Sequence, residues 1–226
     1  MNDNREMTVI ARIHTPFAGK FGVPRQSGLA PTEGRIVFAP AYRNPDALRG
    51  LEGFSHLWLI WVFDRAERKD WSPTVRPPRL GGNRRMGVFA TRSPFRPNPI
   101  GLSCVELAAV EWSTPDGPVL HVRGADLVDG TPILDIKPYL PYCDAKPQAT
   151  GGFTDGLTGG ALQVVCPPEL LARLPEKDRP GLLAVLGGDP RPRYQDDPAR
   201  VYGLTYGQRN VKFRVAGDVL TVEDVE

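Results

Sequence analysis

The sequence lacks the glycine signature of a dinucleotide-binding Rossmann sheet, because no two of its 24 glycines stand at G-x-G spacing. It also has no P-loop and no G-x-S-x-G nucleophile elbow. Its three histidines, His14, His56 and His121, are widely spaced and match no zinc pattern. NAD-dependent redox chemistry, metal-dependent hydrolysis and the usual Rossmann-type methyltransferase sheet are therefore disfavoured.

Cysteines are also few, and none of them stands in a C-x-x-C pair. The three are Cys104, Cys143 and Cys166, an odd number, and the polar N-terminal stretch does not resemble a signal peptide. The longest apolar run, residues 54–63, is too short to span a bilayer. We therefore expect reduced cysteines in a cytoplasmic protein.

What the chain does have is enough apolar residues for a core and frequent breaks between apolar runs. Its 226 residues are 41% hydrophobic, which suits one main domain with a small appendage. Prolines and glycines, 24 of each, punctuate the apolar runs and indicate short strands joined by structured loops. Strands are expected at residues 8–14, 34–39, 54–63, 88–91, 100–110, 119–122, 125–128 and 133–136. Because no long helix separates them, the pattern predicts a barrel or a sandwich.

The composition changes after Tyr142. Residues 145–160 include ten Gly, Ala or Thr residues and few large apolar ones, which is typical of a linker or an exposed loop. Short helices are expected at 169–174 and 180–186, and strands at 201–206, 210–215 and 219–222. We therefore predict a β body over 1–145, a linker over 146–166 and a small α+β domain over 167–226.

One loop is stiffened by three prolines between residues 94 and 99. Each proline fixes φ, removes a backbone donor and drives the residue before it toward extended geometry. The loop therefore displays Arg92, Arg96 and Asn98 from a rigid backbone, which lowers the entropy lost when a ligand binds. A proline-rich crossover with solvated arginines would give the same pattern.

The charge of the chain is concentrated around this loop. The whole sequence carries a net charge of +2, but residues 65–96 hold nine Lys or Arg and two acidic residues, a local excess of +7. A basic stretch beside Trp71 and Phe95 suits nucleic-acid phosphates and bases, although a solvated loop would look similar. The RNA-contact candidates are Arg76, Arg79, Arg84, Arg85 and Arg96.

The proline loop and its flanks also carry a family resemblance. Residues 87–103 read GVFATRSPFRPNPIGLS, preceded by PRLGG and followed by DLVDGTPILDIKPYLPY over 126–142. With PRQSG, LEGFSHLWLIWVF and DPRPRY elsewhere, the chain resembles the TrmO family. These are S-adenosylmethionine-dependent tRNA methyltransferases that methylate N6 of threonylcarbamoyladenosine at position 37. The resemblance implies a mainly β fold, an antiparallel β-barrel body with a small C-terminal α+β appendage, and a homodimer.

The resemblance also implies a set of cofactor-binding residues in several loops. They are Arg25, Gln26, Ser27, Gly28, Asp64, Arg65, Arg92, Leu102, Arg123, Gly124, Ala125, Asp126 and Leu127. In this scheme Arg92 pairs with the carboxylate of S-adenosylmethionine, because a guanidinium and a carboxylate can form two parallel hydrogen bonds. Leu102 and Leu127 are expected to wall the adenine.

For catalysis, Asp135 is the candidate base that removes the N6 proton. Residues 135 and 137 share one face of an extended chain, so Lys137 can keep Asp135 ionised or neutralise the threonyl carboxylate of the substrate. Tyr139 and Tyr142 are expected to stack on the adenine. A surface Asp–Lys pair with tyrosines at a sheet edge is the alternative interpretation, and such a pair adds little stability.

Two other functions fit parts of the sequence. A non-catalytic β-barrel that binds single-stranded RNA would explain the arginines but not the Asp135–Lys137 pair. A methyltransferase with a small-molecule acceptor would explain the cofactor residues but not the basic stretch. A weaker hypothesis has residues 190–194, which include Tyr194, closing over the substrate.

Overall fold

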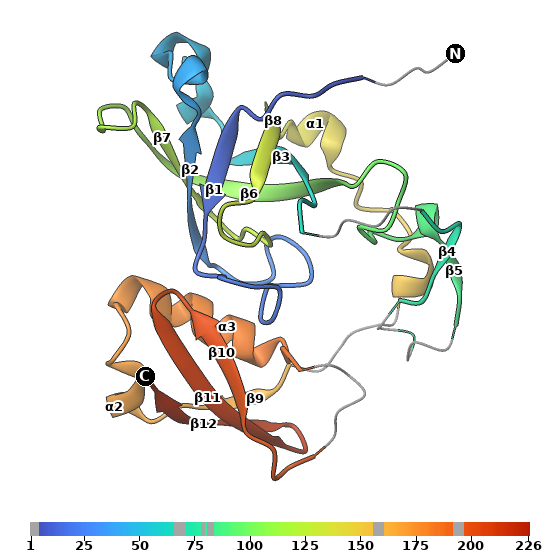
Figure 1. The fold of residues 1–226 in the computed structure, drawn as a ribbon, viewed down its shortest axis with the longest axis vertical. Helices are drawn as coiled ribbons and strands as arrows, with labels where there is room; N and C mark the ends of the chain where they lie inside the picture. The colour runs from blue at the N-terminus through green and yellow to red at the C-terminus, as the bar shows by residue number, and fades with distance from the viewer. Residues whose placement is uncertain (1–4, 66–70, 78–79, 81–83, 156–160, 192–196) are drawn as a thin grey trace.

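The computed structural model describes residues 5–65, 71–77, 80, 84–155, 161–191 and 197–226. The chain forms two bodies, each built around its own sheet, and a small ribbon stands away from both (Figure 1). Arg79 and Tyr194, both singled out above, lie outside the described residues. No helix in the described part of the chain is long and apolar enough to cross a membrane.

The first body is a closed barrel of six strands in the order β1-β2-β7-β6-β3-β8, and every neighbouring pair is antiparallel. The strands are β1 (Ala11–His14), β2 (Glu33–Phe38), β3 (His56–Val62), β6 (Ile100–Glu111), β7 (Val119–Arg123) and β8 (Pro132–Pro138). The predicted antiparallel β-barrel is confirmed. Its closure leaves no exposed sheet edge in this body.

The barrel interior is filled by alternate side chains of each strand. In β3, Leu57, Leu59 and Trp61 are buried and their neighbours are only partly covered. The strand predicted over 54–63 is present as β3, and its outer face is only partly covered. Its apolar outer residues are available to a ligand or a partner.

Two predicted strands are absent because hydrogen bonds outside any ladder hold these segments. Residues 88–90 form the 3₁₀ helix η5 (Val88–Ala90), where Thr91 donates from both its backbone N–H and its hydroxyl to the Val88 carbonyl. Residues 125–128 belong to no strand, although Ala125 and Leu127 are buried. The Thr32 and Thr15 hydroxyls donate to the Ala125 and Leu127 carbonyls, replacing a strand partner.

The remaining elements of this half of the chain are short. Residues 45–48 and 51–53 form 3₁₀ helices, and residues 86–87 pair with 74–75 in the ribbon that projects at the right of Figure 1. The elements are η1 (Pro40–Tyr42), η2 (Pro45–Leu48), η3 (Leu51–Gly53), β4 (Thr74–Val75), β5 (Met86–Gly87), α1 (Pro141–Asp144) and η6 (Gly152–Thr154).

The second body is a four-stranded sheet in the order β10-β11-β12-β9, covered by helices on one face. Its elements are β9 (Gln163–Val165), α2 (Pro168–Leu171), η7 (Glu176–Asp178), α3 (Arg179–Gly187), β10 (Tyr202–Tyr206), β11 (Arg209–Ala216) and β12 (Val219–Val225). The small α+β appendage is confirmed. β9 falls inside the predicted linker and pairs in parallel with β12, while the domain limits at 145 and 167 stay predictions.

The loop after β1 joins the two bodies. Phe17 and Ala30 are buried in the core of the C-terminal sheet, where Phe17 meets the Tyr206 ring edge-on at 5.8 Å. The Gly207 backbone N–H also donates to the Pro16 carbonyl at 2.7 Å. The loop over 15–31 is therefore fixed by the barrel on one side and by the C-terminal sheet on the other.

Candidate active site at the mouth of the barrel

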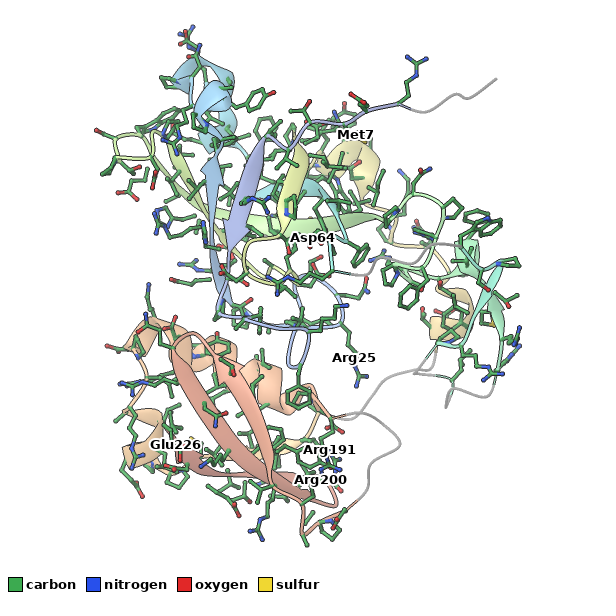
Figure 2. The ribbon with its side chains drawn as sticks, viewed as in Figure 1. Met7, Arg25, Asp64, Arg191, Arg200 and Glu226 are labelled. Atoms are coloured by element: carbon green, nitrogen blue, oxygen red, sulfur yellow. The ribbon has the colours of Figure 1, made fainter. Side chains whose placement is uncertain are left out.

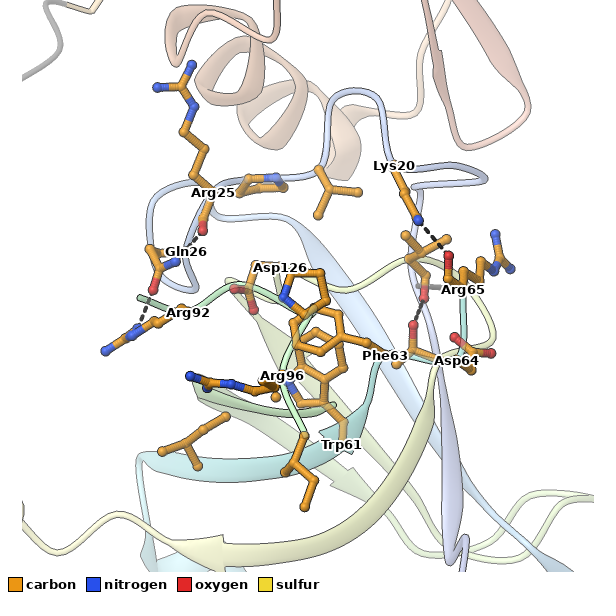
Figure 3. Close-up of a pocket in the computed structure, with 18 of the residues that line it drawn as sticks. Lys20, Arg25, Gln26, Trp61, Phe63, Asp64, Arg65, Arg92, Arg96 and Asp126 are labelled. Atoms are coloured by element: carbon orange, nitrogen blue, oxygen red, sulfur yellow. Dashed lines mark hydrogen bonds between the residues drawn. The ribbon is translucent and has the colours of Figure 1, made fainter. Parts of the chain in front are cut away.

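A cavity of about 570 Å³ opens at the end of the barrel that faces the C-terminal sheet (Figure 3). Its walls come from the loop after β1, the end of β3, the proline loop, the start of β6 and the segment after β7. The lining residues are Lys20, Val23, Pro24, Arg25, Gln26, Trp61, Phe63, Asp64, Arg65, Arg92, Pro94, Phe95, Arg96, Ile100, Gly101, Leu102, Asp126, Val128 and Thr131.

The apolar part of this cavity is built on two aromatic rings from the end of β3. Trp61 and Phe63 lie with ring centroids 4.2 Å apart. The Trp61 ring covers Gly101 so closely that a Cβ there would stand 2.2 Å from its Cε2 atom. The indole N–H donates to the Ser103 hydroxyl at 3.0 Å, so the ring is held in place from both sides.

Asp126 supplies a half-buried carboxylate to the same cavity. The Ser103 hydroxyl donates to its Oδ1 atom at 2.5 Å, which continues the chain of hydrogen bonds from Trp61. Burial raises the pKa of Asp126, because desolvation disfavours the charged form. The Ser103 hydrogen bond and the Arg92 charge act in the opposite direction. The cavity therefore holds an acid whose ionisation is sensitive to what binds beside it.

A pH-dependent stability follows from the raised pKa of Asp126. Above this pKa the ionised carboxylate lowers the free energy of unfolding, and below the pKa of an unfolded Asp this cost is absent. We therefore expect Asp126→Asn to have a Tm a few degrees above wild type at pH 8, with the gap closing toward pH 4. Calorimetry across this pH range measures the gap, with Asp116→Asn, at a carboxylate that does not line the cavity, as control. A constant gap at every pH would contradict the assignment.

Three of the predicted cofactor loops meet at one side of this cavity. The Arg92 guanidinium donates to the Gln26 side-chain oxygen, as the dashed line in Figure 3 shows. The Ser27 hydroxyl accepts from the Cys104 backbone N–H at 3.1 Å, and the Gly28 N–H donates to the Gly124 carbonyl at 2.8 Å. Gln26 and Arg92, which are 66 residues apart in the sequence, thus meet, and the Arg92 charge acts on Asp126.

The two glycines at this junction are required by its geometry. Gly28 and Gly124 both have positive φ, 77° and 83°, which favours glycine. A Cβ on Gly124 would also stand 3.2 Å from the Gly28 backbone. These two residues and Ser27 do not line the cavity themselves. Their backbone contacts position the neighbouring residues Gln26 and Asp126 at the cavity wall.

Asp64 and Arg65 line the opposite side of the cavity. The Arg65 guanidinium donates to the carbonyls of Ala18 and Asp129 at 3.1 and 2.9 Å, and Lys20 donates to the Arg65 carbonyl at 2.6 Å. Arg65 therefore ties the loop after β1 to the turn before β8. Asp64 stands beside it with its carboxylate at the cavity (Figure 3).

The other predicted cofactor residues lie elsewhere. Arg123 is on the outside of the barrel, where it pairs with Glu106 at 3.1 Å. Ala125 and Leu127 are buried in the barrel core. Leu102 lines the cavity, as expected for a wall against the adenine, but Leu127 does not.

The predicted catalytic residues lie on the outer surface of the barrel beside the cavity. Asp135 pairs with Lys137 at 2.9 Å and sits across from Ile60, which in turn sits across from Leu102. Directly paired residues share a sheet face, so Asp135 lies two strand spacings, roughly 10 Å, from the lining residue Leu102. Asp135 and Lys137 do not line the cavity.

The two tyrosines predicted to stack on the substrate have different surroundings. The Tyr139 ring lies 5.8 Å from Trp58 on the same outer surface. Tyr142, in α1, is 87% exposed. Neither lines the cavity in this single chain.

The predicted RNA-contact arginines divide into two groups. Arg76, Arg84 and Arg85 are exposed on and beside the β4–β5 ribbon. Arg96 donates to the carbonyls of Val88 and Thr91 at 3.2 and 2.9 Å and lines the cavity, so it holds the proline loop in shape.

Several lining residues were not predicted from the sequence. Four of them look like ordinary core or loop residues in the sequence: Trp61, Phe63, Phe95 and Gly101. The others that were missed are Lys20, Val23, Pro24, Pro94, Ile100, Val128 and Thr131. The position of Trp61 and Phe63 just before Asp64, at a strand end, was the one available sign of a site.

The C-terminal sheet supports the cavity through the loop after β1. Val23 lines the cavity and also packs on the C-terminal core, and the Arg25 guanidinium donates to the Asp189 carbonyl at 3.2 Å. Figure 2 shows the Arg25 side chain extending from the barrel toward the C-terminal body. The position of the loop that carries Gln26 therefore depends on the second body.

A substitution of Gly22 tests whether the position of this loop depends on the C-terminal body. Gly22 has a φ of 86°, and a Cβ on it would stand 2.1 Å from Cδ1 of the buried Leu204. We expect Gly22→Ala to lower the free energy of unfolding by about 1–3 kcal/mol and to weaken ligand binding in the cavity severalfold. Gly19→Ala is the matched control, because a Cβ at position 19 meets no atom within 4 Å. Equal ligand affinities for the two variants would show that the loop is positioned without the C-terminal sheet.

Within the described ranges, no group of three or more His, Cys, Asp and Glu side chains is arranged to hold a metal ion. The cavity instead combines aromatic walls with Arg92 and Asp126 on one side and Asp64 on the other (Figure 3). Such a site suits an organic ligand that has an aromatic part and charged groups.

Comparison with known proteins agrees with this site and fold. The tRNA-methyltransferase O N-terminal domain matches residues 12–145, and the TrmO C-terminal domain matches residues 161–226. The chain belongs to the TrmO family. It is 45% identical over 215 residues to the tRNA (adenine(37)-N6)-methyltransferase of Escherichia coli, with 91% of each chain covered.

Further TrmO relatives are similar over nearly the whole length. A putative S-adenosylmethionine-dependent methyltransferase, RcsF, of Pseudomonas aeruginosa is 40% identical over 225 residues, covering 96% of this chain and 95% of that protein. A crystal structure of TrmO superimposes with a TM-score of 0.80 at 35% identity, covering 98% of this chain and 99% of the other. Both the barrel and the C-terminal sheet of the TrmO fold are therefore present here.

Proposed function

We propose that this protein is an S-adenosylmethionine-dependent methyltransferase that methylates N6 of the modified adenosine at position 37 of tRNA, threonylcarbamoyladenosine. The observation that carries this proposal is the meeting of three family loops around one cavity, at Gln26, Arg92 and Asp126. The relatives named above, which act on adenine 37 of tRNA or depend on S-adenosylmethionine, support the reaction and the cofactor.

The cavity fits the cofactor in size and in chemistry. Its volume of about 570 Å³ lies within the range of ligand pockets. Trp61, Phe63 and Leu102 offer apolar surface for the adenine, and Arg92 offers a guanidinium for the carboxylate. Asp64 and Asp126 offer carboxylates for the ammonium and hydroxyl groups.

When bound, S-adenosylmethionine supplies a methyl group on a positively charged sulfonium. The protein has to align the N6 nitrogen with this group, exclude water and accept the N6 proton. We assign the proton to a carboxylate oxygen of Asp135, whose charge Lys137 stabilises at 2.9 Å. Tyr139 and Tyr142 line the approach of the adenine over the outer surface of β8 and α1.

The tRNA is held by the exposed arginines on and beside the β4–β5 ribbon, Arg76, Arg84 and Arg85, together with Arg79. Neutralising phosphates releases counterions, so the affinity for tRNA falls steeply as salt rises.

We further propose that the protein works in the cytoplasm as a homodimer, in which a second copy covers exposed apolar residues such as Leu102. Analytical ultracentrifugation measures this assembly.

Two measurements test the proposal in sequence. Isothermal titration with S-adenosylmethionine should show micromolar binding. Transfer of a labelled methyl group from the cofactor to tRNA that carries threonylcarbamoyladenosine should then be observed, and not to tRNA with unmodified adenosine 37. A folded sample with no binding at millimolar cofactor would overturn the proposal in favour of a non-catalytic RNA-binding barrel.

A further inference from the structure

A second cavity lies directly beside the first. It measures about 350 Å³ and is lined by Phe89, Arg96, Pro97, Asn98 and Ile100. Arg96 and Ile100 line both cavities, so these two side chains form a shared wall. A ligand in the second cavity would therefore lie next to a ligand in the first.

The rim of this second cavity presents aromatic surface to solvent. Phe89 is 76% exposed, and its ring stacks on that of Trp71, which is 51% exposed, with centroids 6.2 Å apart and planes at 27°. Exposed aromatic rings of this size are costly in water unless a ligand covers them. The unpaired face of Phe89 is a stacking surface for a planar ligand.

Asn98 gives the same cavity a hydrogen-bonding group. Its side-chain amide is exposed and makes no hydrogen bond with any residue that the structure describes, while its backbone carbonyl accepts from the Ile100 N–H at 2.7 Å. An amide carries both donors and an acceptor, as the edge of an adenine does. The proline loop fixes the backbone of Asn98, so the amide is presented from a rigid support.

The charge around the cavity selects an anionic partner. Residues 71–96 contain six arginines and not one Asp or Glu. A second copy that met this surface by two-fold symmetry would bring like charges together. An unpaired RNA base brings a planar ring for Phe89 and phosphates for the arginines.

We propose that the second cavity seats the acceptor adenine, which stacks on Phe89 and hydrogen-bonds to Asn98, beside the methyl donor in the first cavity. The Trp71 ring extends this stacking surface toward the neighbouring base of the anticodon loop. This inference rests on the proposed function and adds to it the place where the nucleobase binds. Arg96 and Ile100 then lie between the rings of donor and acceptor, and the N6 group of the acceptor extends beyond these two side chains to the methyl group.

The experiment compares two anticodon stem-loop RNAs, one with adenosine and one with an abasic residue at position 37. For wild-type protein the abasic RNA should bind about tenfold or more weakly, which corresponds to one lost base stack. For Phe89→Ala this difference should shrink severalfold, because the stack is absent and only the contact with Asn98 distinguishes the two RNAs. Phe89→Trp should retain the preference for the RNA with adenosine, because it keeps an aromatic ring. Tyr42→Ala is the control, since Tyr42 lies in the 3₁₀ helix η1 on the far side of the barrel, and it should also retain the preference (Figure 1).

Three outcomes would overturn this inference. A preference that is as large in Phe89→Ala as in wild type would place the base elsewhere. A preference missing from the wild-type protein would do the same. A shift from dimer to monomer in Trp71→Ala or Phe89→Ala would show that a second copy covers the rings. Cofactor titration of the same variants should be unchanged, so a failure here is distinguishable from failure of the methyltransferase proposal, in which wild type itself transfers no methyl group.

Discussion

Asp135→Asn is expected to lower the rate of methyl transfer by about 10²- to 10⁴-fold, the usual effect of losing a general base, while the Kd for S-adenosylmethionine stays within twofold. An Asn side chain keeps the shape of Asp but accepts no proton from N6. Asp135 does not line the cavity, so the cofactor loses no contact. Single-turnover kinetics with saturating tRNA and cofactor titration measure the two quantities separately.

A matched control keeps this experiment specific. Asp116 is another surface carboxylate of the barrel, paired with Arg43 at 3.2 Å, and Asp116→Asn should leave turnover unchanged. Asp126→Asn tests the other carboxylate, which does line the cavity, and should act mainly on cofactor affinity. If turnover survives in Asp135→Asn and is lost in Asp126→Asn with normal cofactor affinity, the base is Asp126.

The fold could be predicted from the sequence because its main signals are local. Alternating burial in β2 and β11 follows from their alternating apolar residues, and the Pro and Gly breaks mark the loops between strands. The two missing strands show the limit of this reasoning. Residues 88–91 and 125–128 alternate like strands, but hydrogen bonds from the Thr91, Thr32 and Thr15 hydroxyls hold them in other conformations.

The site could be predicted only in part, for a different reason. Arg92, Gln26 and Asp126 were found through motifs, and their meeting depends on barrel closure, which no local pattern contains. Trp61 and Phe63 were missed because an apolar ring at a cavity wall and one in a core look alike in sequence. The C-terminal sheet was missed as a support of the cavity, because its contact with Gly22 joins positions about 180 residues apart.

Arg92→Ala is expected to raise the Kd for S-adenosylmethionine by about 10- to 150-fold, the loss of a hydrogen bond to a charged group. Arg92 stands at the cavity with its guanidinium on the Gln26 side chain, and within electrostatic reach of Asp126. Arg92→Lys keeps the charge but not the two-pronged geometry, so it should recover only part of the affinity. Isothermal titration measures all three proteins, and an unchanged Kd in Arg92→Ala would assign Arg92 to RNA binding or to loop structure.

Arg92 can raise the affinity for S-adenosylmethionine in two ways: by contacting the cofactor directly and by changing the ionisation of Asp126. The positive charge of Arg92 lowers the pKa of Asp126 against the larger effect of burial, so its removal raises that pKa further. In Asp126→Asn this second route is absent. If Arg92 binds the cofactor carboxylate directly, adding Arg92→Ala to Asp126→Asn should cost as much affinity as in the wild-type background. A loss that shrinks severalfold in the double variant would show that Arg92 acts chiefly by keeping Asp126 ionised, and that this loss depends on pH.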